Sequence, residues 1–124
     1  MNIYNGQSVK LSDIEIDGYA DFFGKVNDLM EIETSHCVNY FAVPDGESKY
    51  RLYCIIANDE KHTLELLATE VRADEHLQSL TAQHRAFHAY EREMYEAHGL
   101  HFEGHPWLKP LRYPHNKATN GTMY

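Results

Sequence analysis

Residues 37–57 read CVNYFAVPDGESKYRLYCIIA, and this pattern largely determines the architecture of the chain. Its two ends, Cys37–Val43 and Tyr50–Ala57, are rich in Val, Ile, Tyr and Phe, the residue types that favour β-strands. Between them lies Pro44–Ser48, whose Asp-Gly pair tolerates the positive φ of a tight turn. The stretch therefore predicts a β-hairpin.

A further strand is predicted after this hairpin. The polar turn Asn58–Lys61 precedes Thr63–Val71, so three sequential strands with short turns form an antiparallel meander. The middle strand is apolar on both of its faces, and we expect other parts of the chain to cover each face. Residues 1–16 are mixed and polar, and they predict an irregular lead-in or a short edge segment.

Two amphipathic helices are expected to flank the meander. The first follows Asp17, a candidate N-cap, and can cover one face of the sheet. Its apolar positions have helical spacing: Tyr19, Phe22, Phe23, Val26, Leu29 and Met30. The second spans Ala82–His98 and ends at Gly99, which suits a left-handed C-cap. Residues 73–81 read as a connection between the sheet and this helix.

The residues after Gly99 form a proline-punctuated segment. Pro106, Pro110 and Pro114 recur every four residues and interrupt regular hydrogen bonding. The fold class is therefore α+β: an antiparallel three- to four-stranded meander sheet covered by two helices, with an extended C-terminal arm. We divide the chain into a core domain, residues 1–99, and the arm, residues 100–124.

Composition excludes several classes of function. The 124 residues amount to one domain, and 19 acidic against 11 basic residues give a net charge of −8. Such a surface repels nucleic acid and anionic membranes, and the longest nearly apolar stretch, Leu52–Ala57, is too short to cross a bilayer. The lack of a secretory signal at the N-terminus and of a C-x-x-C pair favours the cytoplasm.

Histidines and cysteines offer two chemical hypotheses. Nine histidines, among them His84 and His88 one helical turn apart, could bind a metal, although no H-E-x-x-H or Cys/His pattern is present. Cys37 and Cys54 fall almost opposite each other in the predicted hairpin, where they are better explained as two buried thiols than as a disulfide or a nucleophile. The alternative function is accordingly a stand-alone histidine-rich metal-binding domain or small enzyme.

The charged run in the second half of the second predicted helix, just before the arm, has three interpretations. Its members are Glu91, Arg92, Glu93 and Glu96. They form a solvated helix face, a pair of catalytic carboxylates, or an anchor for the arm or a partner. In the last case Arg92 would bind a carboxylate in bidentate fashion.

Residues 91–111 resemble the signature of the 30 kDa subunit family of respiratory complex I. The family pattern is E-R-E, two residues, an acidic residue, an apolar pair, a glycine, then H-P-x-L-[KR] and an apolar residue. The matching residues are Glu91, Arg92, Glu93, Glu96, Gly99, Gly104, His105, Pro106, Leu108, Lys109 and Leu111, and residues 79–81 are similar to the connection before the signature helix. Ala97 and His98 depart from the pattern, because the family usually has bulky apolar residues there.

The resemblance implies an accessory role rather than catalysis. It implies a structural subunit or domain of an NADH:quinone oxidoreductase, or of a membrane-bound nickel–iron hydrogenase, that packs against the large catalytic subunit, to which it is possibly fused, and near other peripheral-arm subunits. No cofactor is expected in this chain; iron–sulfur, flavin, quinone or nickel–iron sites belong to the partners, on the cytoplasmic face of the membrane. The short chain favours the hydrogenase branch. The expected partner-binding residues are Glu91, Arg92, Glu93, His105, Pro106, Trp107, Leu108, Lys109 and Leu111. A third possibility is that the arm folds back on its own sheet.

Overall fold

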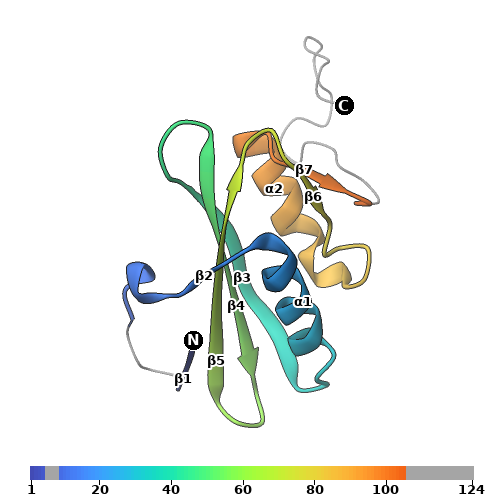
Figure 1. The fold of residues 1–124 in the computed structure, drawn as a ribbon. Helices are drawn as coiled ribbons and strands as arrows, with labels where there is room; N and C mark the ends of the chain where they lie inside the picture. The colour runs from blue at the N-terminus through green and yellow to red at the C-terminus, as the bar shows by residue number, and fades with distance from the viewer. Residues whose placement is uncertain (5–8, 106–124) are drawn as a thin grey trace.

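The computed structural model describes residues 1–4 and 9–105 of the chain. They form one large sheet, a small two-stranded sheet and two α-helices (Figure 1). In chain order the elements are β1 (Asn2–Tyr4), η1 (Leu11–Asp13), β2 (Ile16–Asp17), α1 (Tyr19–Met30), β3 (Ser35–Pro44), β4 (Lys49–Asn58), β5 (Thr63–Arg72), β6 (His76–Gln78), η2 (Arg85–Phe87), α2 (His88–His98) and β7 (His101–Glu103).

The predicted meander is confirmed. β3 pairs antiparallel with β4, and β4 pairs antiparallel with β5 along its whole length. At the first turn the Asp45 amide donates to the Lys49 carbonyl at 2.9 Å, while Gly46 has φ 91° and Ser48 has φ 57°. The Asp-Gly pair therefore supplies the backbone conformation for which it was singled out.

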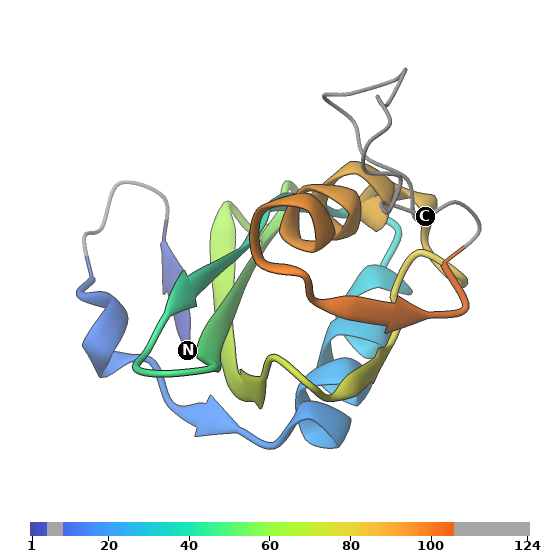
Figure 2. The same cartoon turned by 90° about the horizontal axis from the view of Figure 1, so that it is seen from above.

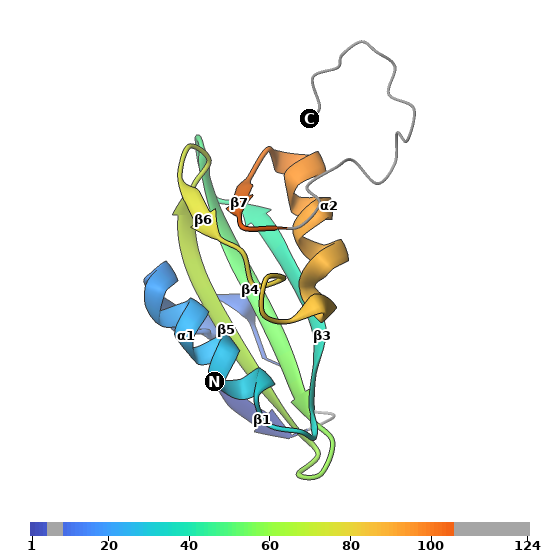
Figure 3. The same ribbon diagram turned by 90° about the vertical axis from the view of Figure 1, so that its right-hand side faces the viewer.

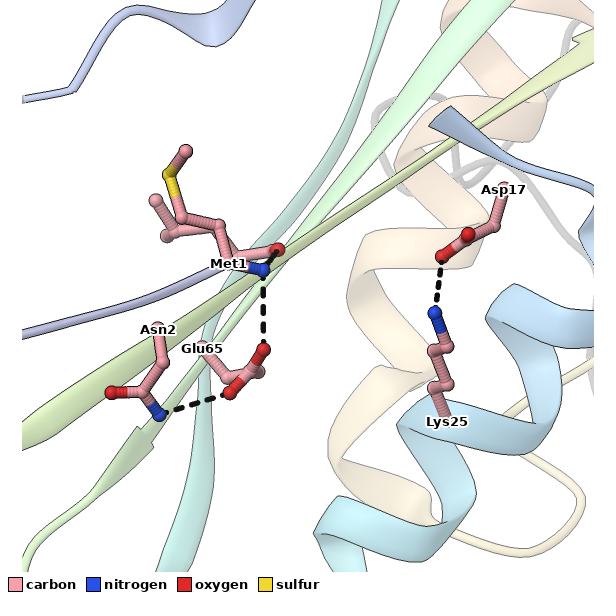
Figure 4. Close-up of polar contacts among 6 residues, drawn as sticks. Met1, Asn2, Asp17, Lys25 and Glu65 are labelled. Atoms are coloured by element: carbon pink, nitrogen blue, oxygen red, sulfur yellow. Dashed lines mark hydrogen bonds and ion pairs between the residues drawn. The ribbon is translucent and has the colours of Figure 1, made fainter. Parts of the chain in front are cut away.

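The lead-in adds two short strands to β5. β1 is antiparallel and β2 parallel to it, so the large sheet has five strands. Figure 4 shows the contacts that hold this edge. The N-terminal ammonium of Met1 lies 3.2 Å from one carboxylate oxygen of Glu65, and the side-chain amide of Asn2 donates to the other oxygen at 3.0 Å. The irregular lead-in of the prediction thus includes a true sheet edge.

Both helices cover the same face of the sheet (Figure 3). Phe22 and Val26 of α1 and Met94 of α2 pack there against strand residues such as Leu52 and Ile56. The opposite face is covered by the lead-in, which lies across the sheet from the two helices in Figure 2. There Ile14 packs against Tyr53 and Leu66. Both faces of β4 are therefore buried, as its apolar sequence predicted.

Both helices begin later than their patterns predicted. α1 starts at Tyr19 with Gly18 as its N-cap, and no side chain caps it, so the expected N-cap role of Asp17 is wrong. The Asp17 carboxylate instead forms an ion pair with Lys25, 2.9 Å away, on the next turns of the helix (Figure 4). α2 starts at His88 rather than Ala82, because residues 85–87 form a separate 3₁₀ turn.

The predicted arm begins differently in the structure. Gly99 ends α2 with φ 71°, as expected, but Leu100 and Phe102 then return to the core and are 0 % and 2 % exposed. Residues 101–103 form β7, which pairs in parallel with β6 inside the predicted connection. The core therefore includes residues after Gly99, the residue at which the predicted core domain ended.

The two cysteines lie on one face of the hairpin but are not direct partners. Cys37 is opposite Ile56, whereas Cys54 is opposite Tyr40, because the hairpin pairs Asp45 with Lys49 and so turns about Glu47. A β-bulge at Val38 shifts the register by one residue. Both thiols are free, and Cys54 is buried. They pack with the apolar core on the helix-covered face, which agrees with the interpretation as small apolar residues.

Candidate functional site

The polar feature that organises the signature region is a buried cluster around Glu91. Its carboxylate is 0 % exposed and lies against the connection that leads from β6 to α2. One oxygen accepts from the Ser79 hydroxyl at 2.5 Å and from the Thr81 hydroxyl at 2.7 Å, and the other accepts from the Leu80 amide at 2.8 Å. The Thr81 amide lies 3.4 Å from the first oxygen. We call these four residues the Glu91 cluster.

The cluster corrects the surface position predicted for Glu91. A carboxylate beside Arg92 and Glu93 was expected on a solvated face, whereas its helical position turns it toward the sheet. A buried charge requires donors, and the Ser-Leu-Thr sequence supplies two hydroxyls and two amides within three residues. The resemblance at residues 79–81 was the one signal in the sequence that could have identified this contact.

The cluster also connects β7 to the rest of the domain. The Ser79 amide donates to the Glu103 carbonyl at 2.9 Å, next to the paired strands β6 and β7. On the other side, the Tyr19 hydroxyl of α1 donates to the Gln78 carbonyl at 2.5 Å. Residues 78–81 are thus held by α1, α2 and β7 together.

Burial raises the pKa of Glu91 above its ordinary value of 4.5, although its hydrogen bonds from Ser79, Leu80 and Thr81 oppose that rise. Burial likewise raises the pKa of Tyr19 and of Tyr40, which both lie near this carboxylate. The charged forms of all three groups are disfavoured for the same reason, which is the loss of water around them.

The raised pKa makes the stability contribution of Glu91 depend on pH. The folded protein holds the carboxyl proton to a higher pH than the unfolded chain does, so this contribution is full below pH 4.5 and is lost as pH rises through the folded pKa. We expect the difference in unfolding free energy between the wild type and Glu91→Gln to decrease from about pH 4 to about pH 8. Urea unfolding of both proteins across this range measures it, and a difference that increases with pH would contradict the direction.

His105 holds the chain at the start of α2. Its Nε2 donates to the His88 carbonyl at 3.2 Å, and the two imidazole rings lie 5.1 Å apart. Burial lowers the pKa of both rings below the ordinary value of 6.5, and the pKa of His88 is lowered further by His105.

Of the other predicted contact residues, Arg92 and Glu93 are partly buried on α2. Pro106, Trp107, Leu108, Lys109 and Leu111 lie outside the described residues.

The histidines are distributed over several elements. His76 pairs with Glu103 at 2.8 Å and its ring stacks on His101, whereas His98 packs against Tyr50. His84 precedes the 3₁₀ turn and lies outside α2, so the two histidines are not one turn apart on a single helix as predicted. Within residues 1–4 and 9–105, no three His, Cys, Asp or Glu side chains converge as metal ligands.

An open groove separates α2 from the outer edge of β3. Its volume is about 400 Å³. The lining residues are Asn39, Tyr40, Phe41 and Ala42 from β3 and Tyr90, Glu93, Met94, Ala97 and His98 from α2. The small side chain of Ala97, one of the two departures from the family signature, leaves this space open.

Comparison with protein families shows where the chain belongs. The family model described as "Respiratory-chain NADH dehydrogenase, 30 Kd subunit" matches residues 13–120, which include strands β2 to β7, both helices and the Glu91 cluster. No curated protein sequence matches the chain. Among the described residues, no helix is both long enough and apolar enough to cross a membrane.

Proposed function

Because the chain belongs to the 30 kDa subunit family of respiratory-chain NADH dehydrogenase, we propose that it is a non-catalytic structural subunit or domain that packs against the large catalytic subunit of its complex. Family membership makes the chain a subunit of an NADH dehydrogenase-type, multi-subunit oxidoreductase complex. The packing against the large subunit is the proposed step. Assembly is therefore the activity to test.

The observation that carries the proposal is the Glu91 cluster. It fixes the start of α2 and the β6–β7 pair to each other at the place where the chain leaves the domain. A buried polar network of this kind specifies one arrangement of its elements, since any other arrangement leaves buried donors unpaired. His105, the last described residue, consequently lies on a rigid base.

Contact with the partner is proposed for residues on both sides of His105. Arg92 and Glu93 on α2 orient the contact, and His105 fixes the chain at the first residue of that helix. Trp107, Leu108 and Leu111 are the proposed apolar anchors, flanked by Pro106 and Lys109. Glu91 acts on the contact indirectly, because its own chain buries it.

The remaining parts of the proposal concern the complex. Iron–sulfur clusters, flavin, quinone or a nickel–iron centre are assigned to the partner subunits, with no cofactor in this chain. The large subunit, which is possibly fused to this chain, is the principal partner, and other peripheral-arm subunits lie nearby. We assign the complex to the hydrogenase branch and place it on the cytoplasmic face of the membrane. A large subunit with paired C-x-x-C motifs, encoded by the adjoining gene, would identify that branch.

Replacing Trp107 and Leu108 together by alanine is expected to weaken co-purification with the large subunit at least about tenfold, because buried aromatic anchors dominate interface energy. Tagged chain and large subunit are co-expressed, and the recovered ratio is measured. Tyr4→Ala, which removes an aromatic ring that is 66 % exposed on β1, is the matched control and is expected to leave the ratio unchanged. Unchanged recovery of the double variant would refute the proposed anchors.

A further inference from the structure

The groove between β3 and α2 opens onto the backbone edge of the sheet. β3 is the outermost strand in the order β1-β5-β4-β3, and among residues 1–4 and 9–105 no strand pairs with its outer side. Four consecutive residues, Asn39–Ala42, line the groove. Because successive side chains of a strand point to opposite faces, a groove lined by all four must face the strand's edge rather than either surface.

The hydrogen bonds around β3 show which backbone groups point outward. By the register set at the Asp45–Lys49 bond, the amide of Tyr40 faces away from β4, and it donates to the side-chain oxygen of Asn39 at 2.9 Å. The Val38 carbonyl accepts from the Tyr90 hydroxyl of α2 at 3.2 Å. Outward groups recur every second residue, so the amide and carbonyl of Ala42 also point into the groove.

Most of this edge is already blocked against further pairing. Tyr90 and Asn39 occupy the outward groups at Val38 and Tyr40, and Pro44 has no amide hydrogen to donate. The β-bulge at Val38 interrupts the strand further. These are the usual means by which proteins protect an edge strand, and they leave a short stretch from the Tyr40 carbonyl to Ala42 open.

The walls of the groove define what fits. Tyr40, Phe41, Tyr90 and Met94 provide apolar contacts, and Ala97 on the helix leaves room for a side chain. Glu93 contributes a carboxylate to the same wall, in a chain whose net charge is −8. Glu93 is also one of the residues proposed above to contact the large subunit, so the groove is continuous with that interface.

We propose that this groove binds a short extended segment of the large subunit, apolar and carrying a Lys or Arg, which adds as a strand along β3 beside α2. This inference rests on the proposed function and specifies how the partner is bound. The added strand accepts a hydrogen bond from the Ala42 amide and donates to the Tyr40 carbonyl, while its side chains pack against α2. Main-chain bonds give such an interaction its affinity and the flanking helix gives its specificity.

Two substitutions test the proposal by separate routes. Ala42→Pro removes the outward amide hydrogen and leaves the bonds to β4 intact, a position where an edge strand tolerates proline. Ala97→Trp fills the groove from the helix without altering β3. Each variant of the full chain is expected to bind the purified large subunit at least about tenfold more weakly than wild type, because either the backbone bond or the space for the segment is lost.

The matched control is Ala89→Trp, which places the same bulk on an exposed position of α2 outside the groove. It is expected to bind like wild type, and hydrogen exchange at the Ala42 amide of the wild-type chain is expected to slow when the large subunit is added. Wild-type binding by Ala42→Pro and Ala97→Trp overturns the groove but not the proposed function. Failure of the wild-type chain itself to bind the large subunit overturns both. Self-association that Ala42→Pro abolishes would assign the edge to a second copy and also overturn the proposal.

Discussion

Replacing Glu91 by alanine is expected to lower the free energy of unfolding by about 3–5 kcal/mol, because each buried donor left without a partner costs about 1–3 kcal/mol. Two hydroxyls and two amides point at this carboxylate, and the site is fully buried. A loss of this size is a large part of the stability of an ordinary domain. Chemical denaturation monitored by circular dichroism measures it.

Two further variants make the result specific to the Glu91 cluster. Glu91→Gln keeps one acceptor oxygen but directs an amide group at the remaining donors, so an intermediate loss is expected. Glu96→Ala removes a carboxylate from the partly buried surface of the same helix and is expected to cost less than about 1 kcal/mol. If Glu91→Ala and Glu96→Ala lowered the free energy of unfolding equally, the Glu91 cluster would contribute no more to stability than a surface carboxylate of the same helix.

Phe102→Ala is expected to cost about 3–5 kcal/mol, since the deletion of a buried phenyl ring leaves a cavity in the core. The side chain is 2 % exposed and belongs to the same apolar cluster as Phe22, Leu52 and Met94. This variant tests whether β7 is part of the folded domain, because a peripheral arm would tolerate the change. Thermal and urea unfolding of the isolated chain give the value.

The neighbouring residue provides the control. His101 is exposed on the other side of β7, and His101→Ala is expected to change the unfolding free energy by no more than about 0.5 kcal/mol. If Phe102→Ala were as mild as His101→Ala, the assignment of β7 to the core would fail. The contrast requires no partner subunit.

The meander could be predicted from sequence because its signals are local. An Asp-Gly turn and a polar four-residue turn separate strands of alternating and β-branched residues, so each pairing joins neighbours in the chain. The apolar middle strand likewise predicted a cover on both faces. The register was less accessible, since the bulge at Val38 has no distinct signature in the residues and the Asp-Gly pair alone does not show that the hairpin turns about Glu47.

The β6–β7 pair and the Glu91 cluster depended on contacts between distant residues. His76–Gln78 and His101–Glu103 are too short to show strand periodicity, and their pairing forms only through the intervening helix. Glu91 lies in a charged run, a pattern typical of solvent-exposed helix faces. Its burial depends on Ser79 and Thr81, which come into reach only when the chain turns back before α2.

β6, α2 and β7 form a parallel crossover, and this arrangement affects the order of events during synthesis. The sheet emerges first, but its helix-covered face stays incomplete until Leu100 and Phe102 are made and β7 pairs with β6. The same pairing brings His105 to the first residue of α2. A newly made chain therefore closes its core and places His105 against α2 together, so that completion of the fold precedes readiness for the proposed assembly.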